Sequence, residues 1–253
     1  QLVTNASKTD FLSDGLLTSP FLLRMVIGRG WGQGPCHSQS FENIWNSIPG
    51  LDVYMPATAS DYKRIFNELV HAKAPMICLE HRWTHLVDAK TEVGHINEGA
   101  VATIFSYSYN SIIATKVSAY LRLFGIELDV VHQLTLNDGF ENLVSSVRRT
   151  KKLITMDLGS RRLGLSSEVI THLSEIGVSM LSPPIRIGCD FKPSSASPES
   201  AYNYFPSAED LFDALGRLLP DNVGLIKEAK KQYALENSDS LSDVPNEKFA
   251  GPF

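Results

Sequence analysis

Cysteine and positive charge are both scarce in this chain of 253 residues. The cysteines are odd in number and lie far apart, at Cys36, Cys78 and Cys189, without a Cys-x-x-Cys pair. Neither a disulfide framework nor a zinc site is indicated, and a reducing compartment fits best. With 23 Lys and Arg against 28 Asp and Glu, the net charge is −5. The charge balance therefore predicts no nucleic-acid partner.

Long apolar runs are also missing. A membrane helix needs roughly 18 apolar residues, and the longest candidate, 112–126, is interrupted by Lys116 and Arg122. We therefore predict no membrane segment. The sequence also lacks a Walker loop, a dinucleotide-binding glycine pattern and a Gly-x-Ser-x-Gly nucleophile motif, and its histidines show no metal-ligand spacing. These absences remove several enzyme classes and predict no metal site.

The pattern that is present alternates between strand and helix along the chain. Apolar runs predict strands at 20–27, 51–56, 76–80, 100–106, 126–131, 152–156 and 185–188. Amphipathic stretches predict helices at 1–13, 38–47, 60–72, 111–124, 140–149, 166–176 and 208–219, with one more beyond Pro220. We expect Ser60 or Asp61 to cap the third helix. This order predicts an α/β fold of two units with mainly parallel sheets.

Two polar stretches divide the chain. Residues 81–99 are charged and irregular and are interpreted as a linker between the two α/β units. Residues 236–245 are polar and are predicted to be extended or disordered. The first eight residues, Gln1 to Lys8, have no helix start signal. We therefore expect the chain to be a processed, cleaved or split piece of a longer protein.

A glycine-rich loop at 28–40 is the best candidate for chemistry. Its glycines and one proline permit close approach of backbone to a ligand, and they are followed by His37, Ser38 and Gln39. The loop follows a predicted strand, and ligands of doubly wound sheets bind beyond the carboxyl ends of the strands. A histidine there can exchange a proton near neutral pH. A lone loop histidine is also common at ordinary surfaces, so on the residues alone both interpretations stay open.

Several stretches together carry a family resemblance. In the first half they are Gln1-Leu-Val-Thr-Asn-Ala-Ser-Lys8, Pro20-Phe-Leu-Leu-Arg24, His37-Ser-Gln-Ser40 and Ile48-Pro-Gly-Leu-Asp-Val-Tyr-Met-Pro56. In the second half they are Val101-Ala-Thr-Ile-Phe-Ser-Tyr-Ser108, Leu123-Phe-Gly-Ile-Glu-Leu-Asp-Val-Val131, Ser146-Val-Arg-Arg-Thr150 and Pro184-Ile-Arg-Ile-Gly188. Their order resembles the beta subunit of thiamine-diphosphate-dependent 2-oxo-acid dehydrogenases of the pyruvate and branched-chain type, in the transketolase superfamily. The resemblance covers roughly residues 1–219.

The resemblance implies a domain order. Residues 1–90 correspond to the C-terminal part of a pyrimidine-binding domain, 91–99 to a linker and 100–220 to a transketolase C-terminal domain. Residues 221–253 form a helical and polar tail.

The resemblance also implies an activity: decarboxylation of a 2-oxo acid and transfer of the acyl group to a lipoyl carrier. His37 corresponds to the family's active-site histidine, which hydrogen-bonds or protonates the substrate-derived oxygen, while Ser38 and Gln39 shape the substrate pocket. Thiamine diphosphate with magnesium would be bound jointly with an alpha subunit. The implied partners are that subunit, a second beta subunit in an alpha2beta2 heterotetramer, and a lipoyl acyltransferase core. The implied compartment is the cytoplasm, or the mitochondrial matrix in a eukaryote.

The chain departs from the family pattern in several places. The glutamate and the stacking aromatic residue that hold the aminopyrimidine ring should lie upstream of Gln1, so no cofactor-binding residue is assigned. Ala72 and Ala74 stand where relatives that bind a structural potassium ion often have Asp and Asn, which puts that ion in doubt. His132-Gln133 stands where an arginine is common.

Two other functions remain open. Gly34-Pro-Cys-His37 also resembles a motif of transketolases and deoxyxylulose-phosphate synthases, although Ser38-Gln39 favours the dehydrogenase branch. The chain could thus be a split transketolase-like subunit that transfers a two-carbon ketol unit, or a non-catalytic assembly subunit. An aromatic cluster, Tyr202-Asn-Tyr-Phe205, is either a docking surface or a loop packed on its own domain.

Overall fold

Seven strands and their flanking helices organise the residues that this computed structural model describes, which are 1–28, 33–197, 200–201 and 203–237. The strands are β1 (Leu22–Ile27), β2 (Asp52–Tyr54), β3 (Met76–His81), β4 (Thr103–Ser106), β5 (Asp129–His132), β6 (Leu153–Ser160) and β7 (Ile185–Cys189). The α-helices are α1 (Thr9–Leu12), α2 (Gly34–His37), α3 (Glu42–Asn46), α4 (Ala59–Leu69), α5 (Tyr109–Leu123), α6 (Glu141–Thr150), α7 (Leu165–Glu175), α9 (Ala208–Leu218) and α10 (Val223–Glu236). Short 3₁₀ helices span Ala6–Lys8, Arg82–Leu86 and Pro220–Asn222.

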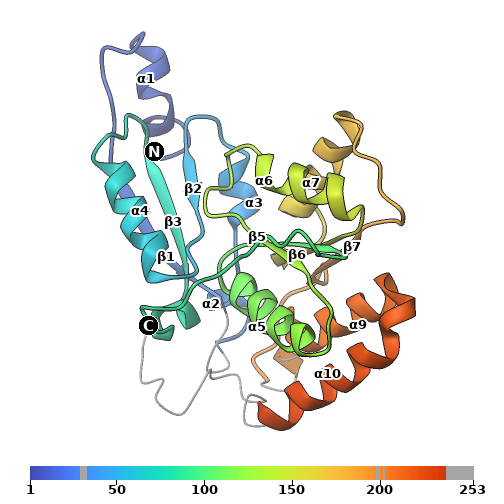
Figure 1. Cartoon of the computed structure of the whole chain (residues 1–253). Helices are drawn as coiled ribbons and strands as arrows, with labels where there is room; N and C mark the ends of the chain where they lie inside the picture. The colour runs from blue at the N-terminus through green and yellow to red at the C-terminus, as the bar shows by residue number, and fades with distance from the viewer. Residues whose placement is uncertain (29–32, 198–199, 202, 238–253) are drawn as a thin grey trace.

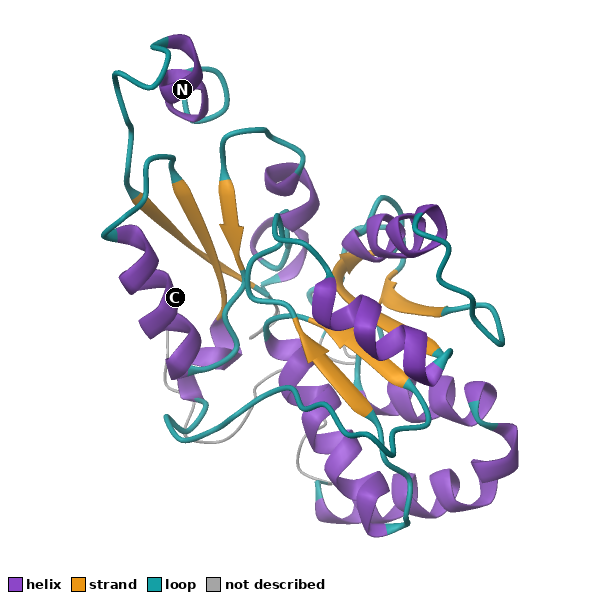
Figure 2. Cartoon of the chain, turned by 45° about the horizontal axis from the view of Figure 1, so that its top comes forward, coloured by secondary structure: helices purple, strands orange, loops and turns teal. Residues whose placement is uncertain are grey.

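The strands form two parallel sheets. One has the order β1-β3-β2 and the other the order β5-β4-β6-β7. The two sheets are separate in space, each with its own helices (Figures 1 and 2). The predicted fold class, two mainly parallel α/β units, is confirmed.

The second sheet is covered on both faces. Leu153 and its neighbours on one face pack against α6 and α7, while Ile154 and its neighbours on the other face pack against α5, α9 and α10. Figure 1 shows these two helical layers above and below the strands. A parallel sheet buried in this way explains the continuous apolar runs that predicted its strands.

The first sheet is covered differently. Met76 and Cys78 of β3 face α4, whereas Ile77 and Leu79 face the second unit and belong to the same apolar cluster as Phe105 and Leu165. The two units therefore share one continuous core, which we call the interdomain core.

Backbone hydrogen bonds also cross this boundary. Residues 134–136 run antiparallel to β2: Met55 N donates to Leu134 O and Leu136 N donates to Val53 O, both at 2.8 Å. The Asn137 side chain continues the pairing, since its Oδ1 accepts from Val53 N at 2.6 Å and its Nδ2 donates to Leu51 O at 3.1 Å. A loop of the second unit thus extends the sheet of the first.

Three local predictions are wrong. The expected helix at 1–13 is broken into a 3₁₀ turn and the single-turn α1, with Phe11 85% exposed. Strand β1 is not buried as expected, because it lies at the edge of its sheet and leaves Val26 48% exposed. Helix α4 is capped by Thr58, not by Ser60 or Asp61; Asp61 completes the capping box from the third helical position.

The predicted tail helix is confirmed as α10, whereas nearly all of the polar stretch 236–245 lies outside the described residues. Among the described helices, none has the length and apolar character that a membrane crossing requires. The domain boundaries proposed at 90, 99 and 220 stay predictions.

Replacing Asn137 by Ala should lower the free energy of unfolding by about 1–3 kcal/mol, because it removes the partners of the Val53 N–H in β2 and of the Leu51 C=O just before it, and both residues are buried. Urea unfolding followed by circular dichroism measures this change. Asp138→Ala, at the exposed neighbouring position, is the control and should change the free energy little. Equal effects of the two substitutions would contradict this role of the Asn137 side chain.

Candidate functional site

The candidate site lies where β1 and β3 end. Gly28 follows β1 with φ of +88°, and a Cβ at this position would collide with the imidazole of His81 at the end of β3. His81 is buried and stacks on the ring of Tyr109, with centroids 4.9 Å apart and planes inclined by 14°. Glycine is therefore needed at position 28, because both the positive φ and the close approach exclude a side chain.

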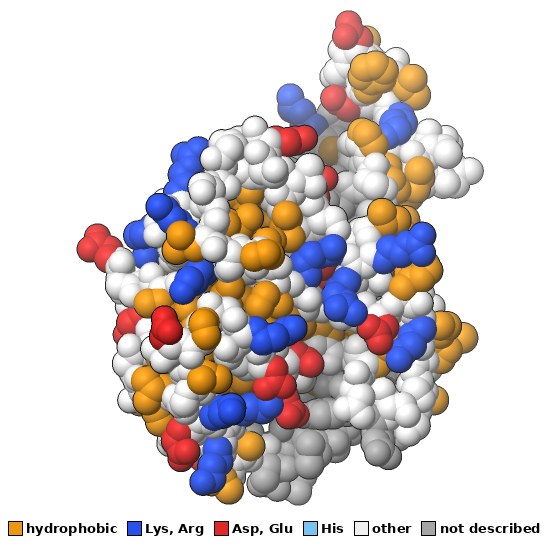
Figure 3. All heavy atoms as spheres, turned by 90° about the vertical axis from the view of Figure 1, so that its right-hand side faces the viewer, with side chains coloured by type: hydrophobic (Ala, Val, Ile, Leu, Met, Phe, Trp, Pro, Cys, Tyr) orange, Lys and Arg blue, Asp and Glu red, His pale blue; other side chains and the backbone are white. Residues whose placement is uncertain are grey.

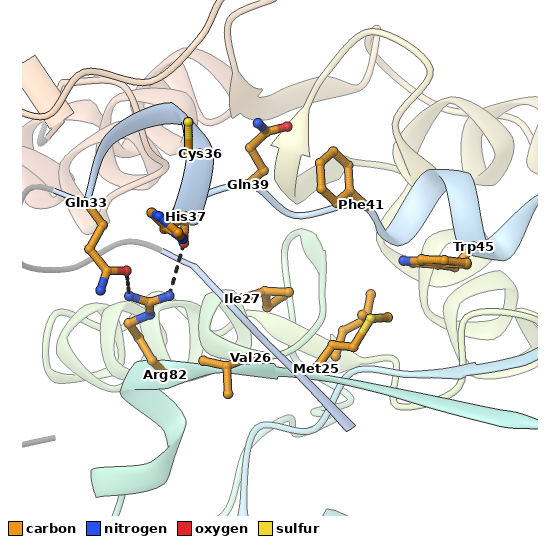
Figure 4. Close-up of a pocket in the computed structure, with 11 residues that line it drawn as sticks. Met25, Val26, Ile27, Gln33, Cys36, His37, Gln39, Phe41, Trp45 and Arg82 are labelled. Atoms are coloured by element: carbon orange, nitrogen blue, oxygen red, sulfur yellow. Dashed lines mark hydrogen bonds between the residues drawn. The ribbon is translucent and has the colours of Figure 1, made fainter. Parts of the chain in front are cut away.

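One arginine attaches helix α2 to the end of β3. The Arg82 guanidinium donates to the backbone oxygen of His37 at 3.0 Å and to Oε1 of Gln33 (Figure 4). Arg82 is itself buried, at 8% exposure. Its two bonds hold both ends of α2 over the sheet edge.

A cavity of about 550 Å³ lies beneath α2. Its walls are mostly apolar and come from β1, β3 and α3, and its polar lining comes from α2 and its surroundings. The lining residues are Met25, Val26, Ile27, Gln33, Cys36, His37, Gln39, Phe41, Trp45, Leu79 and Arg82. Figure 4 shows Gln33, His37 and Arg82 between α2 and β1, whereas the side chains of Cys36, Gln39 and Phe41 point away from β1. An imidazole, an amide and a guanidinium at an apolar cavity can bind an anionic small molecule and exchange a proton with it.

The three predicted site residues fall in two places. His37 and Gln39 are exposed and line this cavity. Ser38 is 5% exposed and lines a second cleft on the other side of the loop, which Gln39 also lines. The glycine positions 30 and 32 of the predicted loop lie outside the described residues. The assigned roles of His37, Ser38 and Gln39 stay predictions.

Arg82 is the residue that sequence reasoning missed. It fell within the stretch interpreted as linker, but it lies directly after a buried strand, at the same sheet edge as the glycine-rich loop. A basic residue at the carboxyl end of a neighbouring parallel strand is the signal that could have identified it.

The second cleft, of about 890 Å³, lies between the loop after α2 and the second unit. Tyr204 and Phe205 of the predicted aromatic cluster line it, and their rings contact each other edge to face with centroids 4.9 Å apart. Both rings are half-buried, and the docking and packing interpretations both stay predictions; Tyr202 lies outside the described residues. Figure 3 shows one face of the molecule, where side chains of both charge signs are interspersed with apolar ones.

A buried carboxylate with two basic partners lies on the α4 side of the first sheet. Glu80 of β3 is 2% exposed; its Oε2 accepts from Arg24 Nη2 at 2.9 Å and lies 3.0 Å from His85 Nε2. Burial alone would raise the pKa of Glu80, but the hydrogen bonds from His85 and Arg24 outweigh it and lower the pKa to about 2. Among the described residues, no group of three or more His, Cys, Asp or Glu side chains is arranged to hold a metal ion.

A second buried carboxyl lies in β6, at the boundary between the units. Asp157 is fully buried and accepts from Ser166 N at 3.0 Å. Burial raises its pKa to about 6, the hydrogen bonds from Ser166 oppose this rise, and the nearby Glu42 carboxyl adds to it.

Comparison with known proteins gives a family match for the second half of the chain. Residues 91–211 match the family model described as Transketolase, C-terminal domain. This chain carries a transketolase C-terminal domain. The matched region begins after the 3₁₀ helix Arg82–Leu86 and ends within α9.

Longer but distant similarity relates the chain to named beta subunits. It is 23% identical over 223 residues to the beta subunit of acetoin:2,6-dichlorophenolindophenol oxidoreductase from Cupriavidus necator, covering 84% of this chain and 64% of that protein. It is 26% identical to the pyruvate dehydrogenase E1 beta subunit of Rhizobium meliloti, covering 73% of this chain and 43% of that protein. The mitochondrial subunit of the same name from Pisum sativum is 25% identical, with 88% and 67% covered. The chain is thus a distant relative of E1 beta subunits and spans less than two thirds of the first two.

A solved structure shares the fold. The chain matches a structure titled as a split gene transketolase, an inactive beta4 tetramer, with a TM-score of 0.62 and 19% sequence identity. The match covers 80% of this chain and 67% of that one. At this identity it supports the fold of both units and not their chemistry.

Glu80→Gln should remove a contribution to stability that depends on pH. Because the folded pKa of Glu80 lies below its ordinary 4.5, the charged form stabilises the fold above pH 4.5, and this contribution is lost as the pH falls toward 2. The variant should be less stable than the wild type by about 1–2 kcal/mol at pH 7, a value reduced for the solvent around Arg24. Urea titrations between pH 2 and 7 measure the difference. Glu175→Gln, at an exposed site, is the charge-matched control; a constant difference over that range would contradict the assignment.

Asp157→Asn should show the opposite sign. The folded pKa of Asp157 lies above its ordinary 3.8, so the wild type loses stability as the pH rises from about 4 through 6. The loss should be about 2–3 kcal/mol, and the variant should lack it. Stability measured from pH 3.5 to 7.5 tests this, with Glu175→Gln again as control. Parallel pH curves for Asp157→Asn and the wild type would refute the inference.

Proposed function

We propose that this chain is the beta subunit of a thiamine-diphosphate-dependent 2-oxo-acid dehydrogenase, which decarboxylates a 2-oxo acid and passes the acyl group to a lipoyl carrier. The observation that carries the proposal is His37 at a cavity of about 550 Å³, held there by Arg82 beyond the carboxyl ends of β1 and β3. The distant E1 beta relatives support it.

The chemistry of the cavity suits an anionic substrate with an apolar side chain. Arg82 brings a permanent positive charge to the cavity wall, which favours a carboxylate there. Met25, Ile27 and Leu79 supply apolar surface for the remainder of the molecule. His37 is the proton donor or acceptor for the substrate-derived oxygen, and Gln39 is a further hydrogen-bonding group beside it.

The coenzyme fits this chain only in part. The described residues offer the imidazole, guanidinium and apolar wall that would face the reacting end of thiamine diphosphate. The sequence offers no residue that we can assign to its aminopyrimidine ring or to a magnesium ion. When bound, the coenzyme supplies the carbanion chemistry, while this chain orients the substrate and holds or moves a proton at His37.

The assembly follows from the same proposal. An alpha subunit would complete the coenzyme site, a second copy of this chain would complete an alpha2beta2 heterotetramer, and a lipoyl acyltransferase core would accept the acyl group. Strand β1, with exposed Val26, borders the cavity and lies at the edge of its sheet in the described part of the chain, where an edge strand can pair with another chain. The compartment would be the cytoplasm or, in a eukaryote, the mitochondrial matrix; the relative from Pisum sativum is named as mitochondrial.

His37→Ala should reduce the decarboxylation rate about 100-fold or more, because proton transfer by a positioned group contributes at least that factor. The chain is reconstituted with the alpha subunit of its own source, thiamine diphosphate and magnesium, and a 2-oxo acid is turned over with 2,6-dichlorophenolindophenol as electron acceptor. His71→Ala removes an exposed histidine elsewhere and should leave the rate unchanged. A His37→Ala rate equal to the wild-type rate would overturn the role of His37.

A split transketolase-like function is the second candidate, favoured by Gly34-Pro-Cys-His37 and by the fold shared with the split gene transketolase. The same reconstituted complex distinguishes it, since that enzyme would consume ketose phosphates and would need no electron acceptor. An assembly subunit would bind the alpha subunit without supporting either reaction.

A further inference from the structure

Glu42 is a fully buried carboxyl in the segment that follows His37. It is the first residue of α3 and has 0% exposure. Burying an isolated carboxylate is costly unless hydrogen bonds replace its lost hydration. The residue therefore needs partners, and the described partners come from the other unit of the protein.

Two groups of the transketolase C-terminal domain donate to Glu42. Oε1 of Glu42 accepts from the Tyr107 hydroxyl at 3.1 Å and from the backbone N–H of Gly159 at 3.0 Å. Tyr107 follows β4 and is itself fully buried, and Gly159 lies near the end of β6. The contact thus joins a residue five positions after His37 directly to β6 and to the residue that follows β4.

The Tyr107 hydroxyl faces a second carboxyl group besides that of Glu42. Oδ1 of Asp157 lies 3.2 Å from the same Tyr107 hydroxyl, and Arg186 of β7 lies 3.9 Å from Oδ2. The hydroxyl carries a single proton and faces both carboxyls. Tyr107 therefore links Glu42 to a buried network formed by β6, β7 and α7.

The backbones also approach closely here. A Cβ at Gly159 would lie 3.0 Å from Oε1 of Glu42 and 3.3 Å from the backbone oxygen of Ser40. Both distances are tighter than usual Cβ contacts. The segment that carries the His-Ser-Gln motif is thus packed so closely against β6 that even a Cβ at position 159 would require its neighbours to shift.

We propose that Glu42 is a positioning residue, which fixes the segment 37–40 to the transketolase C-terminal domain and thereby sets the orientation of His37. Arg82 holds α2 from the first unit and Glu42 holds the following residues from the second. The catalytic significance rests on the proposed function, whereas the anchoring itself does not.

The test of anchoring uses the chain alone and needs no coenzyme or partner. Amide hydrogen exchange is measured for residues 34–46 in the wild type, Glu42→Ala and Glu42→Gln. Loss of both accepted hydrogen bonds in Glu42→Ala should speed exchange in this segment about 10-fold or more, with α5 unchanged. Glu42→Gln keeps an oxygen acceptor and should restore most of the protection. Ile44→Ala, at an exposed position of the same helix, is the matched control and should exchange like the wild type.

A second variant guards against misfolding. Gly159→Ala keeps every hydrogen-bonding group but crowds Glu42 and Ser40, so it should also speed exchange in 34–46. A fluorine label on the exposed thiol of Cys36 gives a spectroscopic readout beside His37, since Cys78 and Cys189 are buried. We expect one sharp resonance in the wild type and a shifted or broadened one in Glu42→Ala and Gly159→Ala. Folded variants with wild-type exchange and a wild-type resonance would overturn the proposal.

The reconstituted complex then separates the two proposals. Faster exchange together with a lower kcat and an unchanged KM in Glu42→Ala, both largely restored in Glu42→Gln, would support positioning of His37. Faster exchange with wild-type kcat would overturn the positioning role. A wild-type complex without activity would count against the proposed function, while the exchange data would still decide the anchoring.

Discussion

The interdomain core is the constraint on which the remaining features depend. Ile77 and Leu79 of β3 pack in one apolar cluster with Phe105 and Leu165 of the other unit. Each such side chain contributes about 1.5–3 kcal/mol when fully buried, against about 1 kcal/mol for a typical hydrogen bond. Apolar burial therefore provides most of the attraction between the units, and the hydrogen bonds at 134–137 fix their register. With the units held in this way, the loop after β1 can be supported from both sides.

Support from two sides gives the candidate site its geometry. Helix α2 has a single turn, too short to keep its own conformation in water. Arg82, directly after β3, binds this helix, and the residues after the helix are bound through Glu42 by Gly159 of β6. Position 37 is thus determined by tertiary contacts of two separate sheets, while its imidazole stays exposed at the cavity.

The sequence predicted the fold class and most element positions because apolar runs of strand length alternate with amphipathic helices. It failed where tertiary context decides. Nothing in 20–27 distinguishes an edge strand from a central one, so the exposure of Val26 was unforeseen. His37 was found through a local motif, but Arg82 and Glu42 were not, because their partners lie 45 to 117 positions away in the chain. Pairings over such separations leave no periodic signal in a single sequence.

Because residues 134–136 of the second unit pair with β2, the edge of the first sheet does not coincide with the boundary between the two units. Cutting the covalent connection between residues 87 and 94 would leave the two pieces joined by that pairing and by their common apolar interior. Each piece made alone would expose the apolar surface that the other covers. The two halves of this chain are therefore complementary parts of one folding unit. Exchanging either half between relatives requires that the contact surface of the new half fits the surface of the half that is kept.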